Sequence, residues 1–197
     1  MIQEIEVTIR GISPLLMSRY IGEQPHMDKP KRKTQQWIDD LHLKDWTQRA
    51  YFDEERGFHV PPEMVEGMLY KGATKQRQGQ LFKEAVAVVE DFIPLIVYSG
   101  PDDAKGRSLK GKLQDYYKRE YIDLRGVVIQ RMRIDRCRPI FRYWGLAFTV
   151  RFENELVEVA DITAALGRAC LGDFRPRFGR FWVTGFEVRE MPAREAA

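Results

Sequence analysis

The sequence contains little cysteine and little histidine. Cys137 and Cys170 are its two cysteines, and neither lies beside another cysteine or a histidine. We therefore expect neither a disulfide framework nor a four-ligand zinc site. The sequence also lacks a phosphate-binding loop, a dinucleotide fingerprint, a nucleophile elbow and a zinc-protease motif. We predict no metal ion and no cofactor.

Long apolar runs are absent as well. The longest apolar stretches, residues 85–89 and 92–98, have the length of a strand, whereas a helix needs about 20 apolar residues to cross a bilayer. The first twenty residues alternate and carry scattered charges, unlike the basic head and apolar middle of a secretory signal. We expect no membrane-spanning segment and a cytoplasmic location.

The composition is that of a globular domain. The 197 residues include 32 Lys+Arg and 29 Asp+Glu, for a formal charge of +3, and 44% are hydrophobic. A chain of this length buries enough surface to fold without a covalent or metal staple. We predict a single domain over residues 1–197, with insertions at about 18–49 and 99–120.

The periodicity of apolar residues predicts an α+β fold. Residues 2–10 alternate like a half-buried strand, and helical spacing recurs from about 62 to 79 and from about 161 to 172. Residues 85–98 are β-rich with a break near Glu90 and Asp91, and further strands are expected at 127–134, 141–152 and 181–188. Without insertions the order is strand, helix, strand, strand, helix, strand. This order predicts a ferredoxin-like or RRM-like antiparallel sheet, with two helices on one face and the other face available.

Positive charge is concentrated between residues 125 and 142, where six arginines accompany one acid, Asp135. This window carries +5, so the rest of the chain sums to −2. Such a division favours a polyanion held on one face.

Arginine spacing within this window suits an extended strand. Arg131 and Arg133 lie two residues apart, and Arg136 and Arg138 form a second such pair. Residues two apart on a strand share a face about 7 Å apart, a spacing that matches successive phosphates of a single strand. The alternative is a solvated strand with cross-strand ion pairs, for which only Asp135 lies near in sequence.

A second basic segment, GDFRPRFGRF, covers residues 172–181 and follows the second predicted helix. Its arginines are Arg175, Arg177 and Arg180, and its phenylalanines are Phe174, Phe178 and Phe181. Cations that hold phosphates, rings that stack on bases and glycines such as Gly179 that expose backbone N–H groups are typical of single-strand binding. The alternative is that the rings belong to the core and the glycines end the helix and begin the strand.

Three motifs resemble those of the RAMP superfamily of CRISPR-associated proteins. They are the loop GDFRPRFGRF between the last helix and last strand, the segment HVPPEMVEGMLYKGATK at residues 59–75, and a first strand followed by GISPLL at residues 11–16. The sequence departs from the family in having Glu63 and Met64 where small residues are usual, and in having two loop glycines rather than a dense run. A phage or prophage relative outside a CRISPR locus would share these features.

The resemblance implies a ferredoxin-like core and one of two activities. Some family members coat guide RNA as the repeated backbone subunit of a ribonucleoprotein, and others cut the precursor transcript. The resemblance further places Lys71, Lys75, Arg19 and Tyr20 near the RNA backbone. The alternative for these four residues is an ordinary solvated helix face and loop.

Catalysis would require a general acid and base near the 2′-hydroxyl of RNA. The candidates are His26, His59 and Tyr20, and neither histidine has a second one nearby in sequence. Asp28 is a further candidate, because some RAMP backbone subunits cut target RNA with an aspartate in the loop after the first strand. A lone histidine is more often structural, so we predict that the protein is not an enzyme.

The leading hypothesis is a module that coats single-stranded guide RNA together with further copies of itself and other ribonucleoprotein subunits. One alternative is a RAMP-type endoribonuclease that processes precursor RNA. Another is a phage or plasmid structural protein whose basic stripe binds an acidic partner protein. The leading hypothesis requires the arginines at 131–138 and 175–180 to be open to solvent and contiguous.

Overall fold

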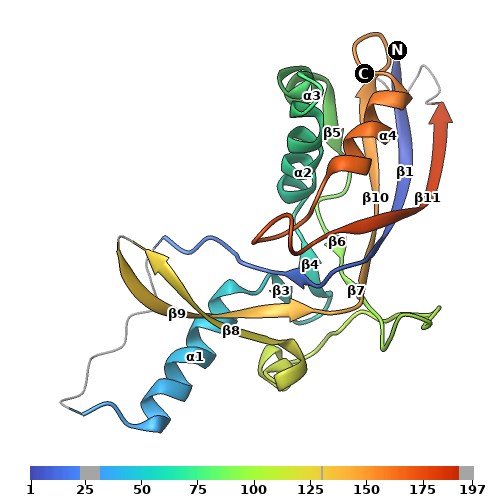
Figure 1. Ribbon diagram of the computed structural model, residues 1–197. Helices are drawn as coiled ribbons and strands as arrows, with labels where there is room; N and C mark the ends of the chain where they lie inside the picture. Colours follow the sequence, from blue (N-terminus) through green and yellow to red (C-terminus); the bar gives the residue numbers. More distant parts are fainter. Residues whose placement is uncertain (23–31, 130, 191–197) are drawn as a thin grey trace.

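The computed structural model describes residues 1–22, 32–129 and 131–190, which form a mixed α+β fold (Figure 1). Its largest sheet has the strand order β11-β1-β10-β5, with all neighbours antiparallel, and β7 pairs with the start of β10. The bounds are β1 Ile2–Gly11, β5 Val86–Val88, β7 Ile96–Val97, β10 Trp144–Glu153 and β11 Phe181–Glu190. The alternating strand predicted at residues 2–10 is confirmed as β1.

Helices α2 (Pro62–Thr74), α3 (Gly79–Ala85) and α4 (Val159–Arg168) lie together against one face of this sheet (Figure 1). Pro62 begins α2, where its missing N–H is not needed. Glu158 and Asp161 form a capping box at the start of α4. At Gly72 of α2 the backbone comes so close to the carbonyl group of Ala165 in α4 that a Cβ would overlap it. The two helices therefore pack in direct contact.

The alternation of β1 divides the sheet into an apolar and a polar face. Ile5, Val7 and Ile9 are fully buried in the main core. On the opposite face, Glu4 pairs with Arg151 and Glu6 with Arg189, each at 2.7 Å. The polar face thus carries cations that are already matched by carboxylates.

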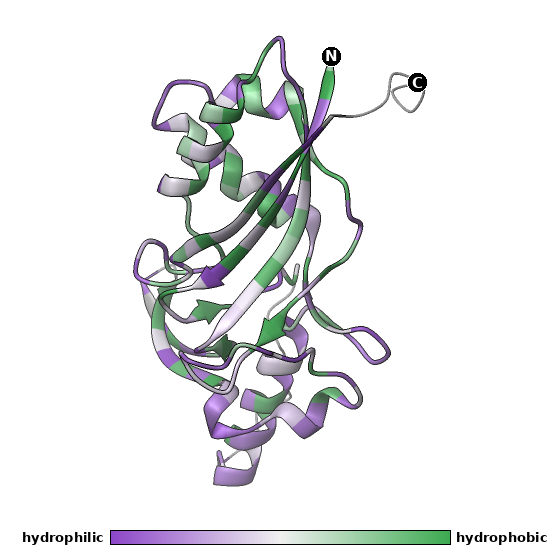
Figure 2. Ribbon diagram, turned by 90° about the vertical axis from the view of Figure 1, so that its right-hand side faces the viewer, coloured by the Kyte–Doolittle hydropathy of each residue, from purple (hydrophilic) through white to green (hydrophobic). Residues whose placement is uncertain are grey.

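The other end of the molecule is built from α1 (Gln35–Arg49) and a second antiparallel sheet of β2 (Leu15–Leu16), β9 (Met132–Phe141) and β8 (Ile122–Ile129), in that order (Figure 1). Short 3-10 helices at Leu113–Tyr116 and Arg119–Tyr121 precede β8, and a third small sheet joins β3 (Phe52–Asp53), β4 (Gly57–Val60) and β6 (Ile93–Pro94). Trp46 of α1 is fully buried and donates its indole N–H to the carbonyl oxygen of Tyr121 at 2.9 Å. Figure 2 shows this α1 end lying beyond the sheet, opposite the α2–α4 helices.

Two sequence predictions are corrected by these bounds. The segment 127–134 is not one strand, because it crosses the turn between β8 and β9, where Arg131 has a φ of +66°. The helix expected at 62–79 is divided into α2 and α3.

In the part of the chain that the structure describes, no helix combines the length and apolarity needed to span a bilayer.

Candidate nucleic-acid interface

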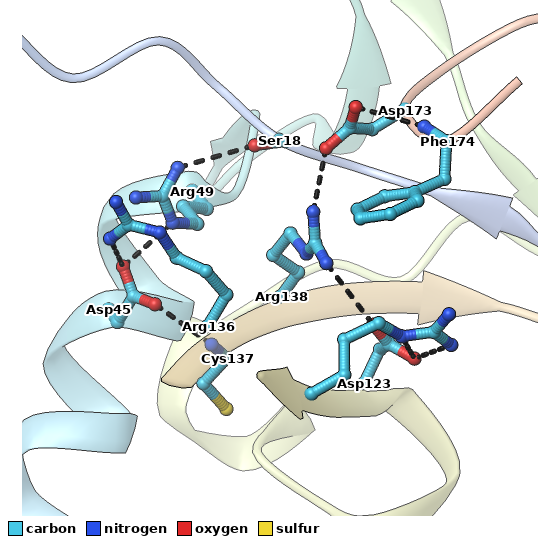
Figure 3. A network of polar contacts seen from close by, with 10 residues as sticks. Ser18, Asp45, Arg49, Asp123, Arg136, Cys137, Arg138, Asp173 and Phe174 are labelled. Atoms are coloured by element: carbon cyan, nitrogen blue, oxygen red, sulfur yellow. Dashed lines mark hydrogen bonds and ion pairs between the residues drawn. The ribbon is translucent and has the colours of Figure 1, made fainter. Parts of the chain in front are cut away.

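A cavity of about 390 Å³ lies where α1, the β8–β9 hairpin, the loop after β2 and the loop after α4 meet. Its charged lining consists of Arg19, Arg49, Arg136, Arg138 and Asp173, and its rings are Tyr20 and Phe174. Figure 3 shows most of these groups with the acids that support them. We call this space the arginine cavity.

The last turn of α1 supplies one side of the arginine cavity. Asp45 and Arg49 lie one helical turn apart, with 2.7 Å between Asp45 Oδ1 and Arg49 Nε. Asp45 also lies 3.7 Å from Arg136 Nη1 and accepts the backbone N–H of Cys137 at 2.8 Å (Figure 3). Asp45 therefore ties α1 to β9 at two points, Arg136 and the Cys137 N–H.

Arg138 of β9 supplies the other side of the cavity. Its Nη1 donates to Asp173 Oδ2 at 2.7 Å, its Nη2 lies 3.7 Å from Asp123 Oδ2, and its guanidinium carbon lies 4.6 Å from the centroid of the Phe174 ring. Asp123 is shared with Arg125. Arg138 is only 3% exposed.

The cations of this cluster outnumber its acids. Arg19, Arg49, Arg125, Arg136 and Arg138 are opposed by Asp45, Asp123 and Asp173, which leaves a surplus of two positive charges. Burial lowers the pKa of Arg136 and of Arg138, yet guanidinium groups remain charged in proteins. Arg49, Arg136 and Arg138 are buried and equal the aspartates in number, so the surplus corresponds to the exposed Arg19 and the half-buried Arg125. Guanidinium groups in excess of carboxylates make the cavity chemically suited to an anion.

Four residues singled out in the sequence come together here. Arg19 and Tyr20 reach the cavity from the loop after β2, while Arg136 and Arg138 reach it from the same face of β9, as their spacing predicts. The expectation that Arg136 and Arg138 are open to solvent is wrong. Both are buried, because carboxylates distant in sequence compensate much of their charge.

Arg131 and Arg133 lie at the tip of the same hairpin and are exposed. Arg131 occupies the turn and Arg133 belongs to β9, where its Nε lies over Gly126 of β8. Among the residues that the structure describes, neither side chain forms an ion pair or lines the cavity. The cationic surface is thus divided between a buried cluster at the hairpin base and an exposed pair at its tip.

The loop after α4 agrees only in part with its predicted role. Arg175, Arg177 and Arg180 are exposed, but none of them lines the cavity. Phe178 is buried against Leu16 and Ile140, so its ring is not available for stacking on a base. The predicted contact through Gly179 is also wrong, because this glycine is buried against the backbone of Leu171. The ring that this loop exposes is Phe174.

The remaining candidates lie elsewhere. Lys71 is exposed on α2, Lys75 reaches the carbonyl oxygen of Arg168 at 3.5 Å, and neither lines the arginine cavity. His59 of β4 lies 4.4 Å from the Phe92 ring, centroid to centroid, and burial lowers its pKa. His26 and Asp28 fall outside the described residues.

Residues 1–22, 32–129 and 131–190 contain no cluster of three or more His, Cys, Asp or Glu side chains that could hold a metal ion. The acids of the arginine cavity are instead each bound to an arginine. Its donor set is therefore one of guanidinium groups, which bind anions.

Sequence reasoning missed Arg49 and the three aspartates of the cluster. The Asp45–Arg49 spacing of four residues on a helix is a readable signal for an ion pair. Asp123 and Asp173 offer no such local signal, because only the fold brings them to Arg138.

Cys137 lies beside this cluster and should be chemically inert. Burial raises the pKa of its thiol to about 12, and the thiolate is the reactive form. We expect a thiol-specific chromogenic disulfide at pH 8 to modify the half-buried Cys170 in the folded protein and Cys137 only after unfolding in urea. The stabilising effect of burying a neutral thiol should be complete below about pH 9 and be lost as the pH rises towards 12.

A Cys170→Ser variant provides the control for this experiment, since it should show no rapid phase in the folded state. Equal reaction rates for both thiols of the folded protein would contradict the burial of Cys137.

The sequence matches no protein-family model, and no curated protein shows significant similarity to it.

Proposed function

We propose that the protein binds single-stranded RNA as a subunit of a CRISPR-type ribonucleoprotein, with copies of itself side by side on one strand. The observation that carries the proposal is the surplus of arginine over aspartate around the arginine cavity. The β8–β9 hairpin, which lines part of this cavity, also exposes Arg131 and Arg133 at its tip. Guanidinium groups bind phosphates with two parallel hydrogen bonds, which suits a polyanionic backbone.

The aromatic residues favour a single strand over a duplex. Tyr20 is 86% exposed and Phe174 is 43% exposed, and both border the cavity. Exposed rings beside cations are the usual platform for unstacked bases, whereas a duplex keeps its bases paired and inaccessible to such rings.

We also propose that the large sheet with α2 and α4 is a ferredoxin-like core. Its support is the chain order β1, α2, β5, β10, α4, β11 together with the antiparallel sheet order β11-β1-β10-β5. In this arrangement each helix connects two parallel strands with one antiparallel strand between them, which is the split β-α-β unit. On the polar sheet face, Arg151 and Arg189 are paired with Glu4 and Glu6, so we assign RNA to the hairpin end instead.

The proposal is tested by the salt dependence of RNA affinity. We expect the logarithm of the association constant for a single-stranded RNA to fall steeply with the logarithm of salt concentration. The double variant Arg131→Gln/Arg133→Gln should bind more weakly, and its slope should be shallower by about 0.7 for each lost phosphate contact. Fluorescence anisotropy of a labelled RNA at several salt concentrations measures both quantities.

The matched control is Arg151→Gln/Arg189→Gln, which removes the same charge from the polar face of the large sheet. This control should bind RNA nearly as well as the unmodified protein. Affinity that does not depend on salt, or an equal loss in the control, would reject the proposal.

A further inference from the structure

We infer that the arginine cavity is a binding site for one nucleotide, in which the phosphate takes the guanidinium donors and competes with the Asp173 carboxylate for Arg138. The inference rests on the proposed function for the class of ligand, and it adds a defined site, its phosphate ligands and an internal competitor.

Unused hydrogen-bond donors point to the ligand. Arg49 Nη2, Arg138 Nε and Arg138 Nη2 are buried and form no hydrogen bond among the described residues. The two residues are 7% and 3% exposed, and both line the cavity. Buried charged donors without acceptors are unfavourable, and a phosphate has three oxygens with which to satisfy them.

The nearby carboxylates leave two of these donors without an acceptor. Asp45 Oδ1 already binds Arg49 Nε, and its Oδ2 already accepts the Cys137 N–H. Asp123 Oδ1 is engaged by Arg125, whereas its Oδ2 forms no hydrogen bond and faces Arg138 Nη2 at 3.7 Å. Arg49 Nη2 and Arg138 Nε therefore remain available to an anion that enters the cavity.

The charge and size of the cavity fit a nucleotide. The cluster carries two surplus positive charges, and a phosphate monoester carries about −1.5 to −2 at pH 7. A volume of about 390 Å³ is within the range of about 300–1,000 Å³ usual for small-molecule sites. Tyr20 and Phe174 provide exposed rings at the wall on which a base can stack.

Asp173 is the acidic residue that lines the cavity, and its position allows a ligand to displace it from Arg138. Its side chain is 43% exposed, whereas that of its partner Arg138 is 4% exposed. Its Oδ1 accepts the Phe174 N–H at 2.9 Å, and its Oδ2 holds Arg138. Because the carboxylate can turn into water while the guanidinium cannot, a phosphate can replace it on Arg138.

The experiment compares the full chain with Asp173→Asn by isothermal titration calorimetry, using adenosine 5′-monophosphate, adenosine and inorganic phosphate as probes. Asparagine keeps an oxygen for the Phe174 N–H but removes the competing charge. We expect the monophosphate to bind Asp173→Asn about tenfold more tightly than the unmodified protein. Adenosine and inorganic phosphate should each bind more weakly than the monophosphate.

Two further variants sharpen the result. Asp102→Asn removes the same charge from an exposed loop position and should leave the affinity unchanged. Tyr20→Ala removes an exposed ring and should weaken the binding of the monophosphate but not the binding of inorganic phosphate. A gain of affinity cannot come from misfolding, so Asp173→Asn remains informative even if other variants are unstable.

Parallel RNA titrations separate this inference from the proposed function. RNA binding without any monophosphate binding to either protein would overturn the inference and leave the proposed function standing. Monophosphate binding without RNA binding would support the site and reject the proposed function. Unchanged or lower affinity in Asp173→Asn would overturn the competition, and inorganic phosphate binding as tightly as the monophosphate would overturn the nucleotide assignment.

Discussion

Replacing Asp45 by alanine should lower the free energy of unfolding by about 3–5 kcal/mol, because the change leaves buried charges without a partner. Asp45 holds Arg49 and Arg136 and also accepts the backbone N–H of Cys137. All of these groups are buried. Urea unfolding followed by tryptophan fluorescence measures the loss, and Trp46, the next residue along α1, is a buried reporter.

Asp40→Ala is the matched control, because Asp40 is an exposed residue of the same helix that accepts a hydrogen bond from Gln36. Its effect should stay within about 0.5 kcal/mol. The loss of unfolding free energy in Asp45→Asn should lie between those of the two alanine variants. Asparagine can still accept the Cys137 N–H, but it no longer offsets the guanidinium charges. A loss in Asp45→Ala no larger than in Asp40→Ala would contradict the ion-pair cluster.

The element pattern could be predicted from sequence wherever one face of an element is buried. Alternation in β1 follows directly from burial of Ile5, Val7 and Ile9. The β8–β9 hairpin was mispredicted because no glycine, proline, asparagine or aspartate separates Ile129 from Met132. Without such turn residues, two strands read as one.

The arginines that β9 contributes to the site could be predicted from the sequence, but their burial could not. The spacing of Arg136 and Arg138 places them on one face, but burial depends on acids that arrive from α1, β8 and the loop after α4. Counting charges along the sequence predicts arginines that are open to solvent. In the structure, Arg136 and Arg138 instead lie beside aspartates that are distant in sequence. On this hairpin, the exposed Arg131 and Arg133 lie where the hairpin extends beyond the reach of these acids.

The loop after α4 shows the same limit for glycine. The sequence predicts that Gly179 contacts the ligand, because glycine lets the backbone approach another group closely. The close approach is real, but the group approached is the backbone of Leu171. Gly179 donates its N–H to Pro14 and accepts the N–H of Leu171, both at 2.9 Å, so it closes the loop that carries Asp173 and Phe174.

Gly179→Ala should therefore lower the free energy of unfolding by at least about 4 kcal/mol, through a steric overlap added to backbone strain. Gly179 has a φ of +73°, and a Cβ at this position would overlap the carbonyl oxygen of Leu171. Urea unfolding monitored by circular dichroism measures the loss. Where the variant still folds, displacement of the loop should also weaken RNA binding, because Asp173 and Phe174 would leave the arginine cavity.

Gly111→Ala separates the two causes. Gly111 has a φ of +109° but open space where a Cβ would lie, so its replacement incurs a backbone strain of about 1–3 kcal/mol without an overlap. The difference between the two variants then measures the cost of moving Leu171 and its loop. Equal losses would mean that the loop relaxes freely around an added methyl group, and the arrangement of Asp173 and Phe174 at the cavity would then not depend on Gly179.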